Sequence, residues 1–354
     1  MLQQTQVATV IPYFTRFIAR FPTIRALARA DANAVLHQWS GLGYYARARN
    51  LHRAAQVLVR EHGGRIPRDF AAVAALPGIG RSTAGAILAL AYDGRHAILD
   101  GNVKRVLARY HAIAEPLQGA AVQQRLWELA ECHTPRARVG DYTQAVMDLG
   151  ATLCRRAQPL CDRCPLRRGC AAYAEGNPEA YPRPAKRKNV PARSVRMLLI
   201  QDAEGRVLLQ RRPPAGIWGG LWGLPECRGR DVRAWSQATL GLDIAPGRRW
   251  PRLRHTFSHF HLDIHPIPAR LLKSAASAMG EPGHSRTDLP SVRAGERPTK
   301  DGRAGVSKRY RAAPGTAGTA MEDTDTVWYN CRQPDERGLA APVKRLLDQL
   351  LRGT

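Results

Sequence analysis

The chain has 354 residues, which is too long for one ordinary hydrophobic core and predicts two domains. Lys and Arg number 54 against 29 Asp and Glu, and the formal charge of +25 favours a polyanionic partner, with nucleic acid as the leading candidate. No apolar run is long enough to cross a membrane and no signal-like apolar segment opens the chain. We therefore exclude an integral membrane protein and a disulfide-rich secreted protein, and expect a soluble protein of the cytoplasm.

The first 150 residues or so alternate between amphipathic helical patterns and Gly or Pro punctuation. The clearest helical patterns cover Ala46 to Glu61 and Ser82 to Tyr92. No β-like run of comparable length interrupts them. We therefore predict an all-α domain over residues 1–152.

A glycine-rich hairpin follows Leu76 within this helical half, in the sequence Leu-Pro-Gly-Ile-Gly. It separates a helix expected to end near Ala75 from one expected to begin near Arg81. Gly78 and Gly80 permit positive φ angles and close approach of the backbone. The following helix would present free N–H groups and its positive dipole end to a phosphate. The pattern predicts a helix-hairpin-helix motif that binds the DNA backbone and reads no base sequence.

Two further stretches carry chemistry suited to an unstacked nucleotide. Tyr44 and Tyr45 stand just before Arg47, which combines aromatic stacking faces with a phosphate donor. Asp100 places one carboxylate at the start of a predicted helix, with Lys104 one turn further on. A carboxylate in that position is most often a simple helix N-cap, so the sequence by itself leaves both roles open.

Four cysteines follow at Cys154, Cys161, Cys164 and Cys170, in the spacing C-x6-C-x2-C-x5-C. Such a cluster of thiolates suits a sulfur-ligated metal centre. A zinc ribbon would more often show two separated C-x2-C pairs, although spacing alone leaves zinc open. Disulfides are disfavoured because the chain has seven cysteines, an odd number. We favour a [4Fe-4S] cluster held in a loop over residues 153–172, where five arginines could bind phosphate.

The remaining chain predicts a linker and an α+β domain. Residues 173–193 are basic and Pro-rich, and we place the linker there. The second domain then covers residues 194–352. Within it, residues 273–321 lack apolar periodicity and predict a disordered insertion.

The strand patterns of this second domain are short. Ser194 to Arg212 holds two β-like runs joined by a hairpin signal, and His255 to Ile267 alternates as one strand would. A further strand is expected from Thr326, and a final amphipathic helix near Ala340 to Leu351.

Together these motifs resemble the adenine glycosylase branch of the endonuclease III, or helix-hairpin-helix-GPD, superfamily of DNA glycosylases. The resemblance spans nearly the whole chain. It implies a multi-domain fold, in which an all-α helix-hairpin-helix glycosylase domain with an iron-sulfur cluster loop precedes an α+β Nudix-like domain. The matching stretches are Met1-LQQTQVATVIPYF, Gly41-LGYYARARNL, Leu76-PGIGRSTAGAIL, Ile98-LDGNVKRVLAR, the four cysteines, Gly216-IWGGLWGLPE and Arg254-HTFSHFHLDI.

The resemblance implies a base-excision-repair enzyme that removes adenine mispaired with 8-oxoguanine or guanine in double-stranded DNA, acting as a monomer near the bacterial nucleoid. Asp100 matches the catalytic aspartate, which stabilises or traps the sugar while water completes hydrolysis. Ser82 stands where bifunctional relatives carry a Schiff-base lysine, which implies a monofunctional glycosylase. The DNA contacts implied on the helical side come from Gln3, Gln4, Tyr44, Arg47, Gly78, Gly80 and Lys104.

The second domain is similar to a Nudix fold that recognises 8-oxoguanine. The stretch from Glu226 to Leu242 lacks the paired glutamates that bind magnesium in a Nudix hydrolase. The resemblance therefore implies a reading domain, in which Phe257, Ser258 and His259 inspect the oxidised base. From the residues alone, these three would be an ordinary strand end.

One family feature is missing at the start of the chain. In the family, a glutamate two residues before the methionine at Met1 protonates the leaving adenine, and a general acid of this kind contributes about 10²–10⁴ in rate. We expect that the start codon is placed too late. The alternative is a non-catalytic protein that binds lesions or mismatches. A thymine or oxidised-pyrimidine glycosylase is disfavoured by Ser82 and by the second domain.

Overall fold

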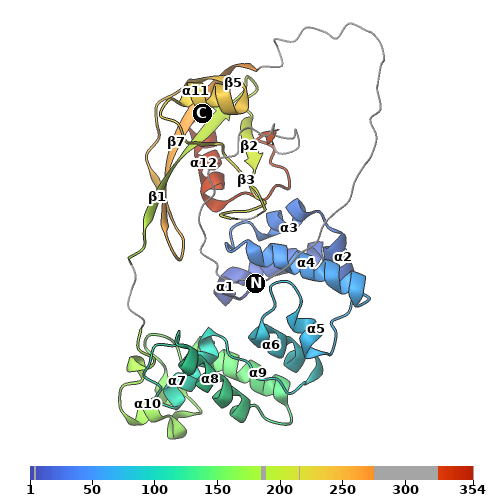
Figure 1. The fold of residues 1–354 in the computed structure, drawn as a ribbon, viewed down its shortest axis with the longest axis vertical. Coiled ribbons are helices and arrows are strands. Elements are labelled where there is room, and N and C mark those ends of the chain that lie inside the picture. The colour runs from blue at the N-terminus through green and yellow to red at the C-terminus, as the bar shows by residue number, and fades with distance from the viewer. Residues whose placement is uncertain (4, 185–188, 215, 275–325, 354) are drawn as a thin grey trace, which may run out of the picture.

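The computed structural model describes residues 1–3, 5–184, 189–214, 216–274 and 326–353 (Figure 1). The N-terminal half is helical, as expected. Helix α4 has the bounds expected from its pattern, and α6 begins one residue earlier. The helices of this half are α1 (Val7–Arg20), α2 (Ile24–Arg29), α3 (Ala32–Trp39), α4 (Ala46–Glu61), α5 (Phe70–Ala74), α6 (Arg81–Tyr92), α7 (Gly101–Tyr110), α8 (Ala120–His133) and α9 (Val139–Asp148).

Apolar faces and polar caps explain why these segments are helical. In α4, the buried residues Ala48, His52 and Ala55 recur at helical spacing and form one face. Asp31 caps α3, because its carboxylate accepts the N–H of Asn33 at 2.7 Å. Within the described ranges, no helix is both long and apolar enough to cross a lipid bilayer.

The cysteine loop continues directly from α9. Helix α9 passes into one π-helical turn, Leu149–Leu153, and the following chain forms only single turns. These turns are the 3₁₀ segments Cys161–Arg163, Arg167–Gly169 and Pro178–Ala180, and the short helix α10 (Ala171–Ala174). The segment Pro178–Ala180 lies inside the predicted linker and α10 extends two residues into it, so the linker is more regular at its start than expected.

The C-terminal half is one mixed sheet with two helices. Strand β1 pairs in parallel with β7 and antiparallel with β2, and the order along the main path is β3-β2-β1-β7-β5. The strands are β1 (Ala192–Gln201), β2 (Val207–Arg211), β3 (Trp222–Gly223), β4 (Glu226–Cys227), β5 (Leu242–Pro246), β6 (Leu253–Thr256), β7 (His261–Ser274) and β8 (Thr326–Tyr329), with helices α11 (Val232–Leu240) and α12 (Ala341–Arg352).

Alternation along β1 explains how the sheet is covered on both faces. Met197 and Leu199 belong to one hydrophobic cluster, which includes α12. Leu198 and Ile200 point to the opposite face and pack in a second cluster with α11. Successive strand side chains alternate between faces, so a run of four apolar residues indicates a strand buried on both sides.

Two strand predictions need correction. The stretch from His255 to Ile267 is a hairpin of β6 and β7, since residues 257–260 turn the chain between them. Strand β7 then extends to Ser274, two residues into the predicted insertion, because it pairs with β5 up to that point. The rest of that insertion, residues 275–321, lies outside the described residues.

The two halves share one hydrophobic core. It contains buried residues of α1, α3 and α4 together with residues of the sheet and α12. Polar contacts cross the same interface: the Tyr45 hydroxyl donates to the Leu339 carbonyl at 3.3 Å, and the Trp222 indole N–H donates to Asn33 at 3.2 Å. Helices α1–α4 therefore lie between the sheet and the lower helices α7–α10 (Figure 1).

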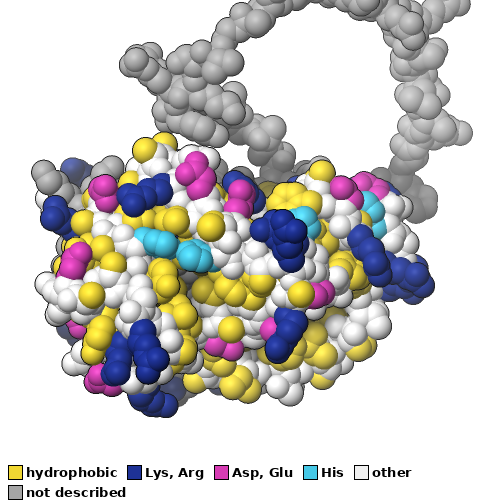
Figure 2. Space-filling view, turned by 90° about the horizontal axis from the view of Figure 1, so that it is seen from below, with side chains coloured by type: hydrophobic (Ala, Val, Ile, Leu, Met, Phe, Trp, Pro, Cys, Tyr) yellow, Lys and Arg dark blue, Asp and Glu magenta, His cyan; other side chains and the backbone are white. Residues whose placement is uncertain are grey.

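The lower face of the molecule carries several exposed positive charges. Figure 2 shows Lys and Arg side chains in several groups on the face formed by the lower helices of Figure 1, with hydrophobic side chains exposed between them. A mixed surface of cations and apolar groups suits contact with a nucleic acid.

Candidate functional site

The glycine hairpin forms as expected between α5 and α6. Gly78 has φ +78°, and a Cβ atom there would lie 2.6 Å from Cβ of Asn50. Gly80 differs from the prediction, because its φ of −97° is one that any residue can adopt. Gly80 is instead the N-cap of α6, where no side chain accepts the first N–H groups. These groups and the helix dipole suit a phosphate ligand.

Replacing Gly78 with alanine should destabilise the hairpin. The positive φ alone costs about 1–2 kcal/mol for a residue with a Cβ, and the contact with Asn50 adds to it. Gly205→Ala is the matched control, since Gly205 has φ +76° and a Cβ atom there would meet nothing within 4 Å. We expect a larger loss of melting temperature for Gly78→Ala in calorimetry. Equal losses would show that close packing on Asn50 is not required.

Asp100 is the N-cap of α7. One carboxylate oxygen, Oδ1, accepts the N–H groups of Asn102 and Val103, both at 2.8 Å. The other oxygen, Oδ2, forms no hydrogen bond with the described part of the chain. The residue is half-buried. The cap therefore fixes the carboxylate while leaving one oxygen available to a substrate.

Ser82 contacts the backbone of the residue before Asp100. Its hydroxyl oxygen accepts the N–H of Leu99 at 2.9 Å, and Leu99 directly precedes Asp100. The first turn of α6 thus holds the start of α7. Sequence reasoning identified Ser82 by the absence of a lysine and missed this positioning contact, which joins residues 17 positions apart.

Helix α7 also connects Asp100 to the cysteine loop. Arg105 donates to the carbonyls of Cys154 and Gly150 at 2.8 and 2.7 Å, and to the side chain of Asn102 at 2.9 Å. Lys104 is half-buried on the same helix and forms no side-chain hydrogen bond within the described residues. Arg105 therefore ties the helix that Asp100 caps to the cysteine loop.

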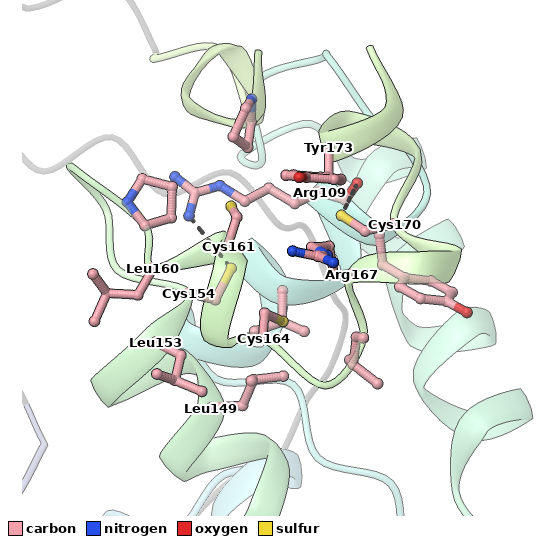
Figure 3. Close-up of a pocket in the computed structure, with 15 residues that line it drawn as sticks. Arg109, Leu149, Leu153, Cys154, Leu160, Cys161, Cys164, Arg167, Cys170 and Tyr173 are labelled. Atoms are coloured by element: carbon pink, nitrogen blue, oxygen red, sulfur yellow. Dashed lines mark hydrogen bonds between the residues drawn. The ribbon is translucent and has the colours of Figure 1, made fainter. Parts of the chain in front are cut away.

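The four cysteines line one pocket, as Figure 3 shows for Cys154, Cys161, Cys164 and Cys170. Burial raises the pKa of Cys161, and the other three thiols raise it further. Burial also raises the pKa of Cys170. In the described ranges, no group of three or more His, Cys, Asp or Glu side chains is arranged to hold a metal ion.

The side chains around this pocket suit an anionic group. Arg109 is 3% exposed, and its guanidinium donates to Sγ of Cys154 at 3.3 Å (Figure 3). Its other acceptors are the backbone carbonyls of Tyr181, Arg155 and Arg156. It pairs with no carboxylate among the described residues. A buried cation needs a counter-charge, and four thiolates around an iron-sulfur cluster would supply one.

The N-terminal residues cover a second, largely apolar cavity of about 630 Å³. Gln3, Arg47 and Gly78 all line it, so three predicted DNA contacts lie together, and Asn50 lines it too. Sequence reasoning missed Asn50. Gln4 lies outside the described residues.

Arg47 is used within the chain. Its guanidinium donates to the carbonyls of Met1, at 2.8 Å, and of Gln3, and lies 5.6 Å from the Tyr44 ring. Tyr44 itself is 51% exposed, with φ +46°. The structure thus gives Arg47 a role in holding the N-terminal residues, and leaves the Tyr44 ring accessible.

A pair of histidines lies at the C-terminal end of α7. The Nε2 atoms of His111 and His133 are 2.9 Å apart, and the Tyr110 ring contacts both imidazoles edge-on. Burial lowers the pKa of His111, and the charges of His133 and Arg125 lower it further. His111 therefore binds a proton more readily in the unfolded chain than in the folded chain.

This pair predicts a loss of stability in weak acid. Since the pKa of His111 is lower in the folded state than its ordinary value of 6.5, stability falls as the pH drops below that value. Melting temperatures measured between about pH 7.5 and 5.5 should fall less for His111→Gln than for the wild type. The control is His62→Gln, because the His62 ring makes no hydrogen bond, ion pair or aromatic ring contact in the described part of the chain. A parallel decline in all three proteins would contradict the assignment.

Phe257, Ser258 and His259 form the turn between β6 and β7. Phe257 anchors the turn, since its ring stacks on Phe260 at 4.5 Å and lies 5.4 Å from Trp218. Ser258 and His259 are exposed at the tip. The three residues therefore form a hairpin turn that directly follows β6 and has an exposed tip.

Two carboxylates in the stretch that lacks the hydrolase signature, Glu226 to Leu242, have structural partners. Glu226 forms an ion pair with Arg212. Asp231 caps α11 by accepting the N–H groups of Arg233 and Ala234 at 2.9 and 3.0 Å. Both carboxylates therefore serve the fold of the second domain.

Comparison with known proteins agrees with this arrangement. The family of HhH-GPD superfamily base excision DNA repair proteins matches residues 1–132, and the NUDIX domain family matches residues 196–294. The adenine DNA glycosylase of Buchnera aphidicola subsp. Acyrthosiphon pisum (strain APS) is 33% identical over 348 residues, covering 98% of this chain and 87% of that protein. The adenine DNA glycosylase of Homo sapiens is 34% identical over 74% of this chain and 58% of that protein.

A solved structure of a thermostable thymine-DNA glycosylase is 27% identical, with a TM-score of 0.43, over 49% of this chain and 80% of that one. The similarity to the Buchnera protein, by contrast, covers 98% of this chain and so spans both its helical half and its sheet. The chain therefore belongs to the adenine DNA glycosylases, and it is a DNA glycosylase of base excision repair.

Proposed function

We propose that this glycosylase removes adenine paired with 8-oxoguanine or guanine in double-stranded DNA, as a monomer and without cutting the strand. The observation that carries the proposal is the placement of Asp100, whose carboxylate is fixed by α7 with one oxygen free. Ser82 supports it, because the residue at the start of α6 offers a hydroxyl to Leu99 and no amine to a sugar.

Asp100 would act on the sugar of a nucleotide flipped out of the duplex. Cleavage of an N-glycosidic bond develops positive charge on the sugar, and a fixed carboxylate stabilises that charge. Such electrostatic stabilisation contributes about 10²–10³ in rate. Adenine leaves with the bonding electron pair, a water molecule adds to the sugar, and the water's proton goes to the departing base, so the products are free adenine and an abasic site in an intact strand.

We further propose that Cys154, Cys161, Cys164 and Cys170 hold a [4Fe-4S] cluster. When bound, it would tie four points of a loop that has only single turns of regular structure. Arg109 would neutralise part of its negative charge. Because Arg105 joins this loop to α7, the same unit supports Asp100.

The monofunctional step is tested by borohydride trapping. A bifunctional glycosylase forms a Schiff base that borohydride converts to a stable protein–DNA adduct. We expect abasic sites that break only on alkali treatment, with no adduct at Ser82 in the wild type and an adduct in Ser82→Lys. An adduct formed efficiently by the wild-type protein would contradict the proposed mechanism.

The exposed tip of the β6–β7 turn would read the oxidised guanine. Ser258→Ala should reduce the preference for 8-oxoguanine over guanine by about threefold to tenfold, since one neutral hydrogen bond contributes about 0.5–1.5 kcal/mol. Ser194→Ala is the control, because Ser194 is exposed in the same domain on β1. The measurement is the ratio of adenine excision rates on the two duplexes. An unchanged ratio in Ser258→Ala would exclude this contact.

A further inference from the structure

The loop between β2 and β3 contacts the helical half of the molecule, where it lies beside α3 and α4 (Figure 1). The Gly219 carbonyl accepts a hydrogen bond from the Arg49 guanidinium of α4 at 2.6 Å. A Cβ atom on Gly220 would lie 3.7 Å from the Leu36 side chain of α3. Arg49 is half-buried, and the Gly219 carbonyl is its only side-chain hydrogen-bond acceptor among the described residues. The loop is therefore tied to the helical half by a specific contact.

Trp218, in the same loop, packs against the β6–β7 turn. It is 7% exposed, and its ring lies 5.4 Å from Phe257 and 5.5 Å from His255. Phe257 and His255 also contact each other edge-on, with ring centroids 4.7 Å apart. Aromatic rings packed in this way prefer particular distances and angles, so each ring restricts the others. Trp218 therefore supports the base of the turn whose tip exposes Ser258 and His259.

The backbone of Trp218 is strained. Its φ is +54°, a region that residues with a Cβ atom seldom adopt. The Arg212 guanidinium donates to the Ile217 carbonyl at 2.9 Å and lies 5.7 Å from the Trp218 ring. The Leu221 N–H donates to the Trp218 carbonyl at 3.0 Å. Strained residues persist only where surrounding contacts fix them, and they cluster at functional sites. The fold therefore maintains an unfavourable backbone conformation at the residue whose ring packs on the turn.

Helix α4 lies at the other end of these contacts. Arg49 stands in its first turn, since α4 begins at Ala46. Tyr44, whose ring is 51% exposed, and Arg47 belong to the same stretch of chain. The contacts therefore join the turn that would read the oxidised guanine to the segment that carries two predicted DNA contacts, Tyr44 and Arg47.

We infer that Trp218 is a positioning residue for lesion recognition, which fixes the β6–β7 turn relative to α4 through the contact of Gly219 with Arg49. The inference rests on the proposed function. A turn held at one place beside the helical half can contact the base opposite adenine while the adenosine occupies the site at Asp100. Fixing the turn before DNA binds lowers the entropy lost when its tip contacts the oxidised base. Trp218 acts through Phe257 and needs no contact of its own with the DNA.

The first test compares Trp218→Ala with Trp218→Phe in the cluster-containing protein. Both replacements carry a Cβ atom, so both keep the strained backbone and differ only in the ring. Single-turnover rates of adenine release are measured opposite 8-oxoguanine and opposite guanine. Trp218→Ala should reduce the preference for 8-oxoguanine about twofold to tenfold, the effect of one aromatic contact, and Trp218→Phe should restore most of it. Trp235→Ala is the control, because Trp235 packs with α11 on the opposite face of the same sheet and should keep the preference.

The second test breaks the other end of the bridge. Arg49→Met keeps an apolar stem and removes the donors to Gly219, so the preference should fall by a similar factor. The double variant with Trp218→Ala should lose no more preference than either single variant, because both act on one bridge. A phosphate contact by Arg49 would instead lower the slope of log affinity against log salt by about one on both duplexes, and we expect an unchanged slope. Arg53→Met is the control, because Arg53 is exposed on the same helix.

Equal losses of rate opposite 8-oxoguanine and guanine in Trp218→Ala would show that the ring supports only the fold, and would overturn the inference. Additive losses in the double variant would also overturn it. If Trp218→Ala does not fold, Arg49→Met decides, since it changes no core residue, and an unchanged preference there contradicts the inference. Failure of the proposed function differs from these outcomes, because the wild type itself would then release no adenine or release it equally from both duplexes.

Discussion

Asp100→Asn should lower the single-turnover rate of adenine release by about 10²–10³-fold while the protein still folds and binds duplex DNA. Asparagine keeps the acceptor oxygen that caps Asn102 and Val103, and Asp and Asn are equally good N-caps. The substitution therefore removes the negative charge and leaves α7 in place. Adenine release is measured by chromatography, and binding by anisotropy.

Asp231→Asn provides the matched control. Asp231 caps α11 by accepting the backbone N–H groups of the residues two and three positions further along the chain, and Asp100 caps α7 in the same way. Both variants lose one carboxylate at a helix N-cap, and only one of them lies at the proposed site. We expect Asp231→Asn to release adenine at the wild-type rate. If Asp100→Asn does the same, its carboxylate has no catalytic role.

The second large effect is expected from Cys170→Ser. Loss of one ligand should remove the cluster's visible absorbance, lower the melting temperature and weaken duplex binding by about 10²-fold or more, because the loop around residues 153–172 has only single turns to hold it. The Arg109 guanidinium would then be a buried cation without a counter-charge.

Cys132→Ser is the control for this substitution. Cys132 is exposed on α8 and lies away from the pocket. It should keep the absorbance, stability and DNA affinity of the wild type. Elemental analysis of the purified protein distinguishes iron from zinc, and about four irons per chain are expected. Full stability and binding in Cys170→Ser would contradict the proposed role of the cluster.

Local signals in the sequence predicted the local structure well. The bounds of α4, the hairpin between α5 and α6 and the β1–β2 turn follow from apolar spacing and glycine positions within a few residues. Each depends on neighbours in the chain, so no long-range information is needed. The assignment of Asp100 came from the family resemblance, since an N-cap by itself has no catalytic meaning.

Long-range contacts could not be predicted in the same way. The parallel pairing of β1 with β7 joins residues about 70 positions apart, and no periodicity specifies a partner. The contact between Ser82 and Leu99 depends on how α6 packs beside α7.

The measurement that tests the central claim most directly is single-turnover release of adenine from a duplex with adenine opposite 8-oxoguanine, using the cluster-containing wild-type protein. We predict that free adenine appears, that the strand stays intact until alkali is added, and that Asp100→Asn releases far less. Tight binding of the duplex without release of adenine would contradict this mechanism, and would fit a protein that recognises the lesion without excising the base.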